Sequence, residues 1–115
     1  MQLITKEQTA QLFANGKQTA IDHDGSQHWP VVKLFTPDAN ATWLLTELDP
    51  EDPDMAFGLC DLGLGFPELG YVNLVEIKSL RGRLGLPVER DLHFEAKKTI
   101  VEYLDDARQH GCIIA

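Results

Sequence analysis

The chain has 115 residues, of which 43% are hydrophobic and 24% are charged, and it carries a formal net charge of −8. This composition excludes disordered and collagen-like proteins, and the length predicts one domain spanning residues 1–115. No stretch approaches the roughly 18 apolar residues of a membrane-spanning helix, and the N-terminus lacks the apolar run of a signal peptide. We interpret Cys60 and Cys112 as reduced thiols, so the sequence predicts a soluble, cytoplasmic protein without a membrane partner.

The first part of the chain predicts one helix, one turn and one strand. Thr5 is suited to cap a helix that ends just before Gly16, with a glutamine at the capping-box position. The Asp-Gly pair within residues 22–26 is typical of a turn. Residues 31–36 then have the β-branched and aromatic composition of a strand, which Pro37 ends.

The middle of the chain predicts an antiparallel meander. A strand over Thr42–Asp49 is followed by a five-residue loop at 50–54 and a second strand over Met55–Asp61. After the glycine-rich loop at 63–67, a third strand runs over Glu68–Val72. Together with the preceding strand, these segments predict a sheet of about four strands.

The expected register brings carboxylates and aromatic rings onto one face of this sheet. Alternation along the strand puts Trp43, Glu47 and Asp49 on the same side. A five-residue loop would then set Glu47 opposite Phe57 and Trp43 opposite Asp61.

Two helices are expected in the remainder of the chain. Asn73 can cap a short helix that ends before Gly82, and Thr99 with Glu102 forms a capping box for a helix that Gly111 closes. The apolar residues at helical spacing in the last helix are Ile100, Tyr103, Leu104 and Ala107. The predicted fold is therefore α+β, with an antiparallel meander packed against N-terminal, short middle and C-terminal helices.

The negative charge is concentrated in the middle of the chain. Residues 34–77 contain nine acidic residues and no Lys or Arg, whereas the segments on either side are nearly balanced. A segment of this sign repels nucleic-acid phosphates, so we expect no direct binding of nucleic acid. We expect a protein partner with a basic surface instead, and the acidic binding candidates are Glu51, Asp52 and Asp54.

Several motifs are spread over most of the chain. They are F-T-P at 35–37, T-W at 42–43, E-L-D-P at 47–50, F-G-L at 57–59, E-L-G-Y at 68–71 and R-G-R-L-G-L-P-V-E-R-D-L-H-F at 81–94. Together they resemble the DUF2958 family, a bacterial family of unknown function that often occurs on plasmids and other mobile elements. The resemblance implies such a setting and transfers no catalytic or binding residue. The chain differs from shorter members in its longer helical C-terminus after Phe94.

No complete metal or cofactor motif is present. His110 and Cys112 could supply two metal ligands, but a structural zinc site takes about four and no second pair has the required spacing. Gly63 and Gly65 begin a dinucleotide fingerprint, but Glu68 stands where its third glycine is required. We therefore predict no metal and no cofactor.

The segment around Glu89 combines acidic, basic and imidazole side chains. If it is extended, Glu89, Asp91 and His93 face one side, and a carboxylate beside a histidine is suited to acid–base catalysis. Alternatively, Arg90 holds a carboxylate of the meander, such as Glu47, in a structural ion pair.

Two classes of function remain. The favoured one is a non-catalytic protein-interaction module, for which Trp43, Arg81 and Arg90 join the acidic residues as binding candidates. The alternative is a small hydrolase or ligand-binding enzyme, whose catalytic candidates are Glu47, Asp49, Glu89, Asp91 and His93. Convergence of these side chains in a concave site would favour the enzyme, and their mutual pairing would favour the module. The sequence does not indicate an oligomeric state.

Overall fold

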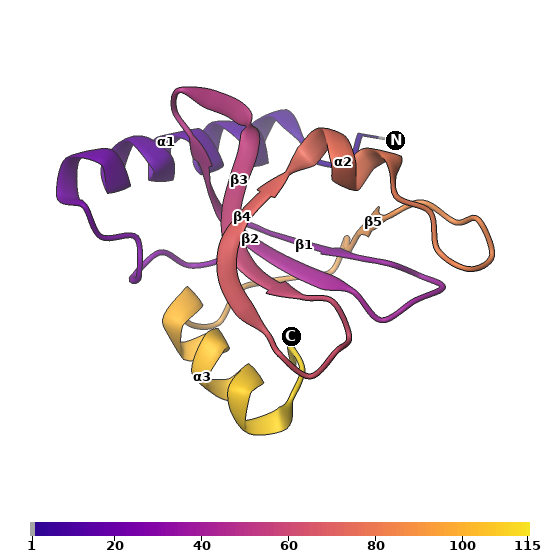
Figure 1. Ribbon diagram of the computed structural model, residues 1–115. Helices are drawn as coiled ribbons and strands as arrows, with labels where there is room; N and C mark the ends of the chain where they lie inside the picture. Colours follow the sequence, from indigo (N-terminus) through magenta and orange to yellow (C-terminus); the bar gives the residue numbers. More distant parts are fainter. Residues whose placement is uncertain (1) are drawn as a thin grey trace.

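The computed structural model describes residues 2–115 and consists of a five-stranded antiparallel sheet with helices on both faces (Figure 1). The strand order is β4-β3-β2-β1-β5. In chain order the elements are α1 (Lys6–Asp22), β1 (Val32–Phe35), β2 (Thr42–Asp49), β3 (Asp52–Asp61), β4 (Glu68–Asn73), α2 (Leu74–Ser79), β5 (Glu89–Arg90) and α3 (Ile100–His110). The α+β fold is confirmed, and β5 is an additional strand that pairs with β1 at the edge of the predicted meander.

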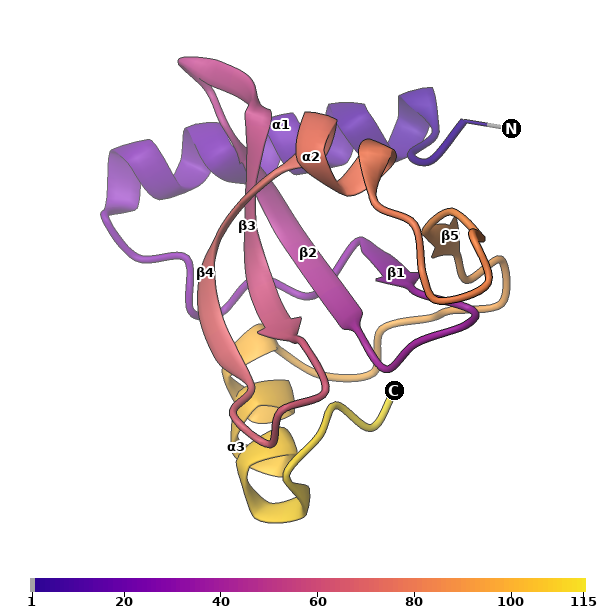
Figure 2. The same ribbon diagram turned by 45° about the vertical axis from the view of Figure 1, so that its right-hand side comes forward.

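Two apolar clusters lie on opposite faces of the sheet. In Figure 2, α1 and α2 cover its upper part and α3 covers its lower part. The first cluster joins Leu12 of α1 and Ile77 of α2 to Trp43 of β2. The second joins Leu44 of β2 to the apolar side of α3. Over residues 2–115, no helix has both the length and the apolar character that crossing a membrane requires.

The helix α1 is longer than predicted. The capping box at Thr5 is confirmed, since the hydroxyl of Thr5 accepts from the amide of Gln8 at 3.1 Å. The helix continues past Gly16, however, and ends at His23 in the left-handed conformation with φ of 60°. Gly16 lies against the backbone of β2, where a Cβ atom would collide with the carbonyl oxygen of Leu48. This glycine therefore permits close packing of α1 on the sheet and does not end the helix.

The register between β2 and β3 contains a β-bulge that the alternation pattern does not reveal. Glu47 lies opposite Phe57 as predicted, but Trp43 lies opposite Cys60 and not opposite Asp61, because the register shifts between Leu45 and Glu47. The extra residue reverses the alternation for the rest of the strand. Leu48 consequently joins Trp43 in the first cluster, and the prediction that Trp43 and Glu47 share a face is wrong.

The connection between β2 and β3 is shorter than predicted. Only Pro50 and Glu51 separate the strands, so the expected five-residue loop is wrong and β3 begins at Asp52. Local hydrogen bonds shape this end of the hairpin. The carboxylate of Asp49 accepts from the amide of Glu51 at 2.9 Å, and that of Asp52 accepts from the amide of Asp54 at 3.2 Å. Such bonds are typical of Asp side chains in turns.

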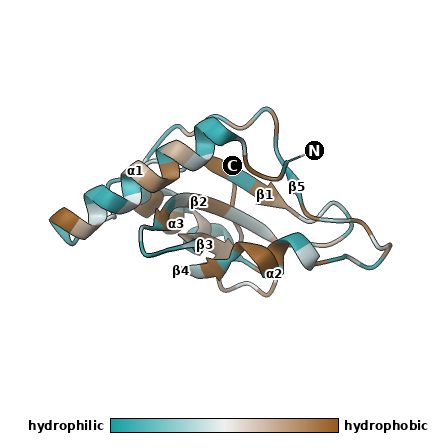
Figure 3. Cartoon of the chain, turned by 90° about the horizontal axis from the view of Figure 1, so that it is seen from above, coloured by the Kyte–Doolittle hydropathy of each residue, from teal (hydrophilic) through white to brown (hydrophobic). Residues whose placement is uncertain are grey.

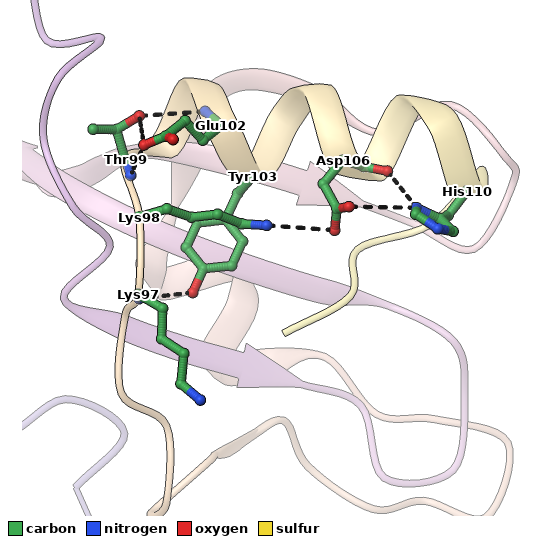
Figure 4. A network of polar contacts seen from close by, with 7 residues as sticks. All are labelled: Lys97, Lys98, Thr99, Glu102, Tyr103, Asp106 and His110. Atoms are coloured by element: carbon green, nitrogen blue, oxygen red, sulfur yellow. Dashed lines mark hydrogen bonds and ion pairs between the residues drawn. The ribbon is translucent and has the colours of Figure 1, made fainter.

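The short and C-terminal helices begin and end as predicted. The Asn73 side chain accepts from the amides of the first turn of α2, and Gly111 follows α3 in the left-handed conformation. The predicted apolar side of α3 is buried. Thr99 donates to the Glu102 carboxylate through both its amide and its hydroxyl, each at 3.0 Å. The amide of Lys97 donates to the hydroxyl of Tyr103, so the segment before α3 is tied to the helix (Figure 4).

Replacing Gly16 with alanine tests the close packing of α1. In an exposed helix this change stabilises by roughly 1 kcal/mol. Here we expect the free energy of unfolding to fall by about 1–3 kcal/mol, because the added methyl group overpacks the contact with Leu48. Gly70→Ala is the control, since no atom lies within 4 Å of a Cβ at that position. Denaturant unfolding measures both variants, and a stabilised Gly16→Ala protein would contradict the account.

Candidate functional site

The five catalytic candidates do not converge. Glu47 lies on the central strand β2, whereas Glu89 lies on β5 at the edge of the sheet, with β1 between these strands. Asp91 forms an ion pair with Lys33 at 3.4 Å, and its carboxylate also accepts from the amide of His93 at 2.9 Å. The backbone turns at this point, so Glu89, Asp91 and His93 do not form one extended row.

The principal cavities do not gather these candidates either. Of the four principal cavities within residues 2–115, none is lined by Glu47, Asp49 or His93. Glu89 and Asp91 line two different cavities. Within the same residues, no three His, Cys, Asp or Glu side chains are grouped so as to hold a metal ion.

Glu47 belongs to a cluster that sequence reasoning missed. Its side chain is 4% exposed and lies beside Thr19 at the end of α1 and His28 in the following loop. The Thr19 hydroxyl is 3.0 Å from Nε2 of His28. Burial raises the pKa of Glu47, and a hydrogen bond from Thr19 and the charge of His28 oppose this shift.

The Asp-Gly pair at residues 24–25 is the sequence feature that could have indicated this cluster. Gly25 passes so close to Glu47 that a Cβ atom at residue 25 would collide with Oε1 of the carboxylate. The same loop continues to His28, whose carbonyl oxygen accepts from the amide of Ile100 at 2.8 Å. The loop thus covers Glu47 and connects α1 to the start of α3. These contacts give Glu47 a structural position rather than access to a substrate.

Cys60 is also unsuited to nucleophilic chemistry. It lies in β3, half-buried against the first apolar cluster. Burial raises the pKa of its thiol to about 11. Because the thiolate is the reactive form, this cysteine is unreactive at neutral pH.

Arg90 ties the N-terminal segment to the edge of the sheet. Its guanidinium donates to the carbonyl oxygens of Gln2 at 2.9 Å and Leu3 at 3.2 Å. The predicted ion pair with a carboxylate of the meander is wrong, and Arg90 takes part in none of the ion pairs within residues 2–115. The reason is topological, since β5 pairs with β1 and the N-terminal segment lies beside it (Figure 3).

The remaining ion pairs belong to the C-terminal helix. Asp106 lies between Lys98 at 3.7 Å and His110 at 3.5 Å, and the Lys98 ammonium also sits 4.9 Å from the centre of the Tyr103 ring (Figure 4). Asp106 of α3 is therefore paired within its own helix and the segment before it.

The acidic residues at the turn between β2 and β3 have no such compensation. Glu51, Asp52 and Asp54 are exposed, and with Asp49 they form what we call the acidic hairpin. None of the ion pairs within residues 2–115 includes any of them. Their hydrogen bonds are made to backbone amides of the same turn, which leaves the four negative charges available to a cation outside the chain.

A groove lies next to the acidic hairpin. Its volume is about 650 Å³, and residues from the N-terminal segment, β2, α2 and β5 line it. Leu48, Leu74 and Val88 supply apolar side chains, while Asp54 and Glu89 supply carboxylates and Lys78 supplies an ammonium group. A neighbouring hollow of about 400 Å³ shares Leu48 and Pro53 with it. The arrangement combines apolar side chains with charged groups, as in many protein-binding surfaces.

The other predicted binding residues are used within the fold. Trp43 is 3% exposed and belongs to the first apolar cluster. Arg81 donates to the carbonyl oxygens of Lys78 at 3.1 Å and Leu80 at 2.7 Å, although its side chain remains exposed.

Replacing Glu47 with glutamine tests the effect of its burial. The raised pKa means that the folded chain holds this proton to a higher pH than the unfolded chain, whose value is near 4.5. The stability of the wild type should therefore decline as pH rises from 4.5 through the folded pKa, and Glu47→Gln should lack this part of the decline. We therefore expect the melting temperature of the variant, measured relative to that of the wild type, to increase from pH 4.5 to pH 8. For the exposed control Glu68→Gln, the difference in melting temperature from the wild type should stay constant with pH. A constant difference for Glu47→Gln would contradict the effect of burial on its pKa.

Replacing Arg90 with alanine tests the tether at the N-terminus. Two charge-assisted hydrogen bonds are lost, so we expect the free energy of unfolding to fall by about 1–2 kcal/mol. Amide hydrogen exchange of residues 3–5 should accelerate as well. Arg83→Ala is the control, because that exposed arginine makes none of the hydrogen bonds or ion pairs described within residues 2–115. Unchanged exchange at the N-terminal segment would show that Arg90 does not hold it.

The comparison with protein families agrees with the motifs in the sequence. Residues 3–114 match the family model described as "Protein of unknown function (DUF2958)". The match includes α3, so the C-terminal helix is part of the family domain. Searches of the curated proteins and of the solved structures give no match. Because the family model covers nearly the whole chain, this protein belongs to the DUF2958 family.

Proposed function

We propose that the chain is a non-catalytic protein-interaction module whose acidic hairpin binds a basic surface of a partner protein. The observation that carries this proposal is the group of four carboxylates at the β2–β3 turn without a cation partner within residues 2–115. Exposed charges of one sign steer the association of an oppositely charged partner. The partner would act in the bacterial cytoplasm, in the mobile-element setting that the family resemblance implies.

The proposal includes the absence of direct nucleic-acid binding by the hairpin. Its carboxylates would repel the phosphate backbone, and desolvating them against DNA offers no compensating contact. A basic protein surface, including one that itself binds nucleic acid, has the complementary charge. The module could therefore occupy such a surface without contacting the nucleic acid.

An enzymatic function has less support. It would require the carboxylates and His93 to share a site, whereas Glu47 and Asp49 lie on β2, Glu89 lies on β5, and Asp91 and His93 lie in the segment after β5. The raised pKa of Glu47 is a feature of many active sites, but this residue is 4% exposed and covered by the loop at Gly25. A substrate would have to displace that loop before reaching the carboxylate.

Charge reversal at the hairpin tests the proposed surface. A partner is first isolated from the native host with the unmodified protein and identified by mass spectrometry. Its association rate is then measured with the Glu51→Lys, Asp52→Lys, Asp54→Lys variant, which we expect to bind about tenfold more slowly at low salt or to lose binding. The difference should shrink as salt rises, because the Debye length is about 10 Å at 0.1 M.

A matched control separates local charge from net charge. The Glu68→Lys, Glu95→Lys, Asp105→Lys variant has the same net charge as the hairpin variant, and all three positions are exposed and outside the hairpin. It should bind at nearly the wild-type rate. Equal losses in both variants, or no loss in either, would contradict the hairpin surface. Retention of duplex DNA by the unmodified protein at physiological salt would contradict the exclusion of nucleic acid.

A further inference from the structure

The segment between α2 and β5 exposes leucines that the fold does not use. We call residues 80–87 the leucine loop; Figure 1 shows it projecting beyond the sheet. Leu84 at its tip is 81% exposed, and Leu80 and Leu86 are 43% and 42% exposed. A contiguous group of exposed apolar side chains on a soluble domain marks an interaction surface more often than isolated exposed residues do.

Hydrogen bonds fix the shape of this loop. Arg81 and Pro87 form a β-bridge, and the amides of Gly82 and Gly85 donate within the loop at 3.0 Å. The carboxylate of Asp38, in the turn between β1 and β2, accepts from the amides of Leu84 at 2.7 Å and Leu86 at 3.3 Å. The leucines are thus presented by a folded loop, and binding them costs little additional conformational entropy.

The loop is also basic. Arg81 and Arg83 are exposed, and neither takes part in the ion pairs within residues 2–115. The hydrogen bonds of Arg81 go to backbone carbonyl oxygens, which carry no net charge. The loop therefore presents leucine side chains beside two arginines that are in no ion pair, while the Asp38 carboxylate is bound to its backbone amides. A surface that is apolar with acidic groups at its border is complementary to such a loop.

The chain itself contains a surface of this kind. The 650 Å³ groove has Leu48, Leu74 and Val88 among its lining residues, together with the carboxylates of Asp54 and Glu89 and the ammonium of Lys78, so its carboxylates outnumber its cations by two to one. Pro87, at the base of the leucine loop, also lines this groove, so the two surfaces are neighbours. The exposure of Leu84 means that the tip of the loop does not fill the groove of its own chain.

We infer that two copies of the chain form a two-fold symmetric dimer in which the leucine loop of each copy docks into the groove of the other. Adjacent complementary surfaces are what a two-fold interface requires, because each contact is then made twice. Leu84 would occupy the apolar floor of the groove, and Arg83 would lie at its acidic border. The net charge of −8 opposes association in general, but residues 78–115 carry seven basic and six acidic residues, so the docking loop lies outside the acidic part of the chain. The inference goes beyond the proposed function and does not rest on it.

Sedimentation velocity over a concentration series tests the dimer. We expect the unmodified protein to reach twice the 12.9 kDa mass of the chain. Leu84→Asp should weaken dimerisation at least tenfold, since it places a charge in the apolar part of the interface. Leu92→Asp is the matched control, because Leu92 is also exposed but lies outside both surfaces. Circular dichroism checks that both variants are folded.

A second variant tests the groove from the opposite side. Thr9 is exposed and lines the groove, so Thr9→Trp should fill it and weaken the dimer, whereas Gln11→Trp on the same helix should not. A monomer at every concentration would overturn the inference, as would a dimer that is insensitive to both Leu84→Asp and Thr9→Trp. The unmodified protein could also be monomeric and capture a host protein whose binding is lost on Leu84→Asp. That result would overturn the dimer and show that the leucine loop binds a different protein. The groove and the acidic hairpin share Asp54, so the charge reversal of the hairpin can also weaken the dimer. Leu84→Asp leaves every carboxylate of the hairpin in place, so a change in sedimentation on this substitution reports on the dimer and not on the hairpin.

Discussion

The β-bulge in β2 determines how the rest of the structure is arranged. Thr46 occupies the position of the register shift and is fully buried, so its polar groups need partners inside the fold. Its carbonyl oxygen accepts from the side chain of Asn15 in α1 at 2.9 Å, and its hydroxyl donates to the carbonyl oxygen of Phe57 at 3.2 Å. The irregular point of the central strand is therefore held by α1 on one side and by β3 on the other.

The position of α1 follows from the same feature. Asn15 fixes the height of the helix over the strand, and the neighbouring Gly16 allows its backbone to approach the carbonyl group of Leu48. Because the bulge reverses the alternation, Leu48 points into the cluster beneath α1 and Glu47 points to the opposite face. The extra residue thus decides that Leu48, and not the buried carboxylate of Glu47, lies on the face that α1 covers.

The charged groups of this protein differ mainly in whether the fold supplies their partners. The carboxylates of Asp91 and Asp106 are paired with cations, and Oδ2 of Asp38 accepts from two amides of a distant loop. The acidic hairpin and the leucine loop each bring together exposed charges of one sign, and these charges take part in none of the ion pairs within residues 2–115. Paired charges of this kind contribute to the fold, whereas exposed charges outside the ion pairs remain available to bind a partner.

Much of the local structure could be predicted from the sequence, because it depends on residues close together in the chain. The capping boxes at Thr5 and Thr99 are examples, since each joins a side chain to an amide three residues away. The strand over Thr42–Asp49 and the apolar side of α3 follow from periodicity in the same way. The motifs of the family are likewise a property of the sequence, and they agree with the match over residues 3–114.

The candidate site was predictable only as a set of residue types. The acidic residues of the middle segment are visible in the sequence, but their lack of cation partners depends on where every Lys and Arg is placed. Glu47 meets Thr19 and His28 only after a bulge has turned it away from Trp43, and Arg90 finds backbone carbonyl oxygens 87 and 88 residues away. The loop around Leu84 depends on Asp38 from another hairpin. Local hydrogen bonds and periodicity determined the helices and strands, whereas the tertiary structure decided the partner of each charged side chain, because that partner is selected by contacts between residues far apart in the chain.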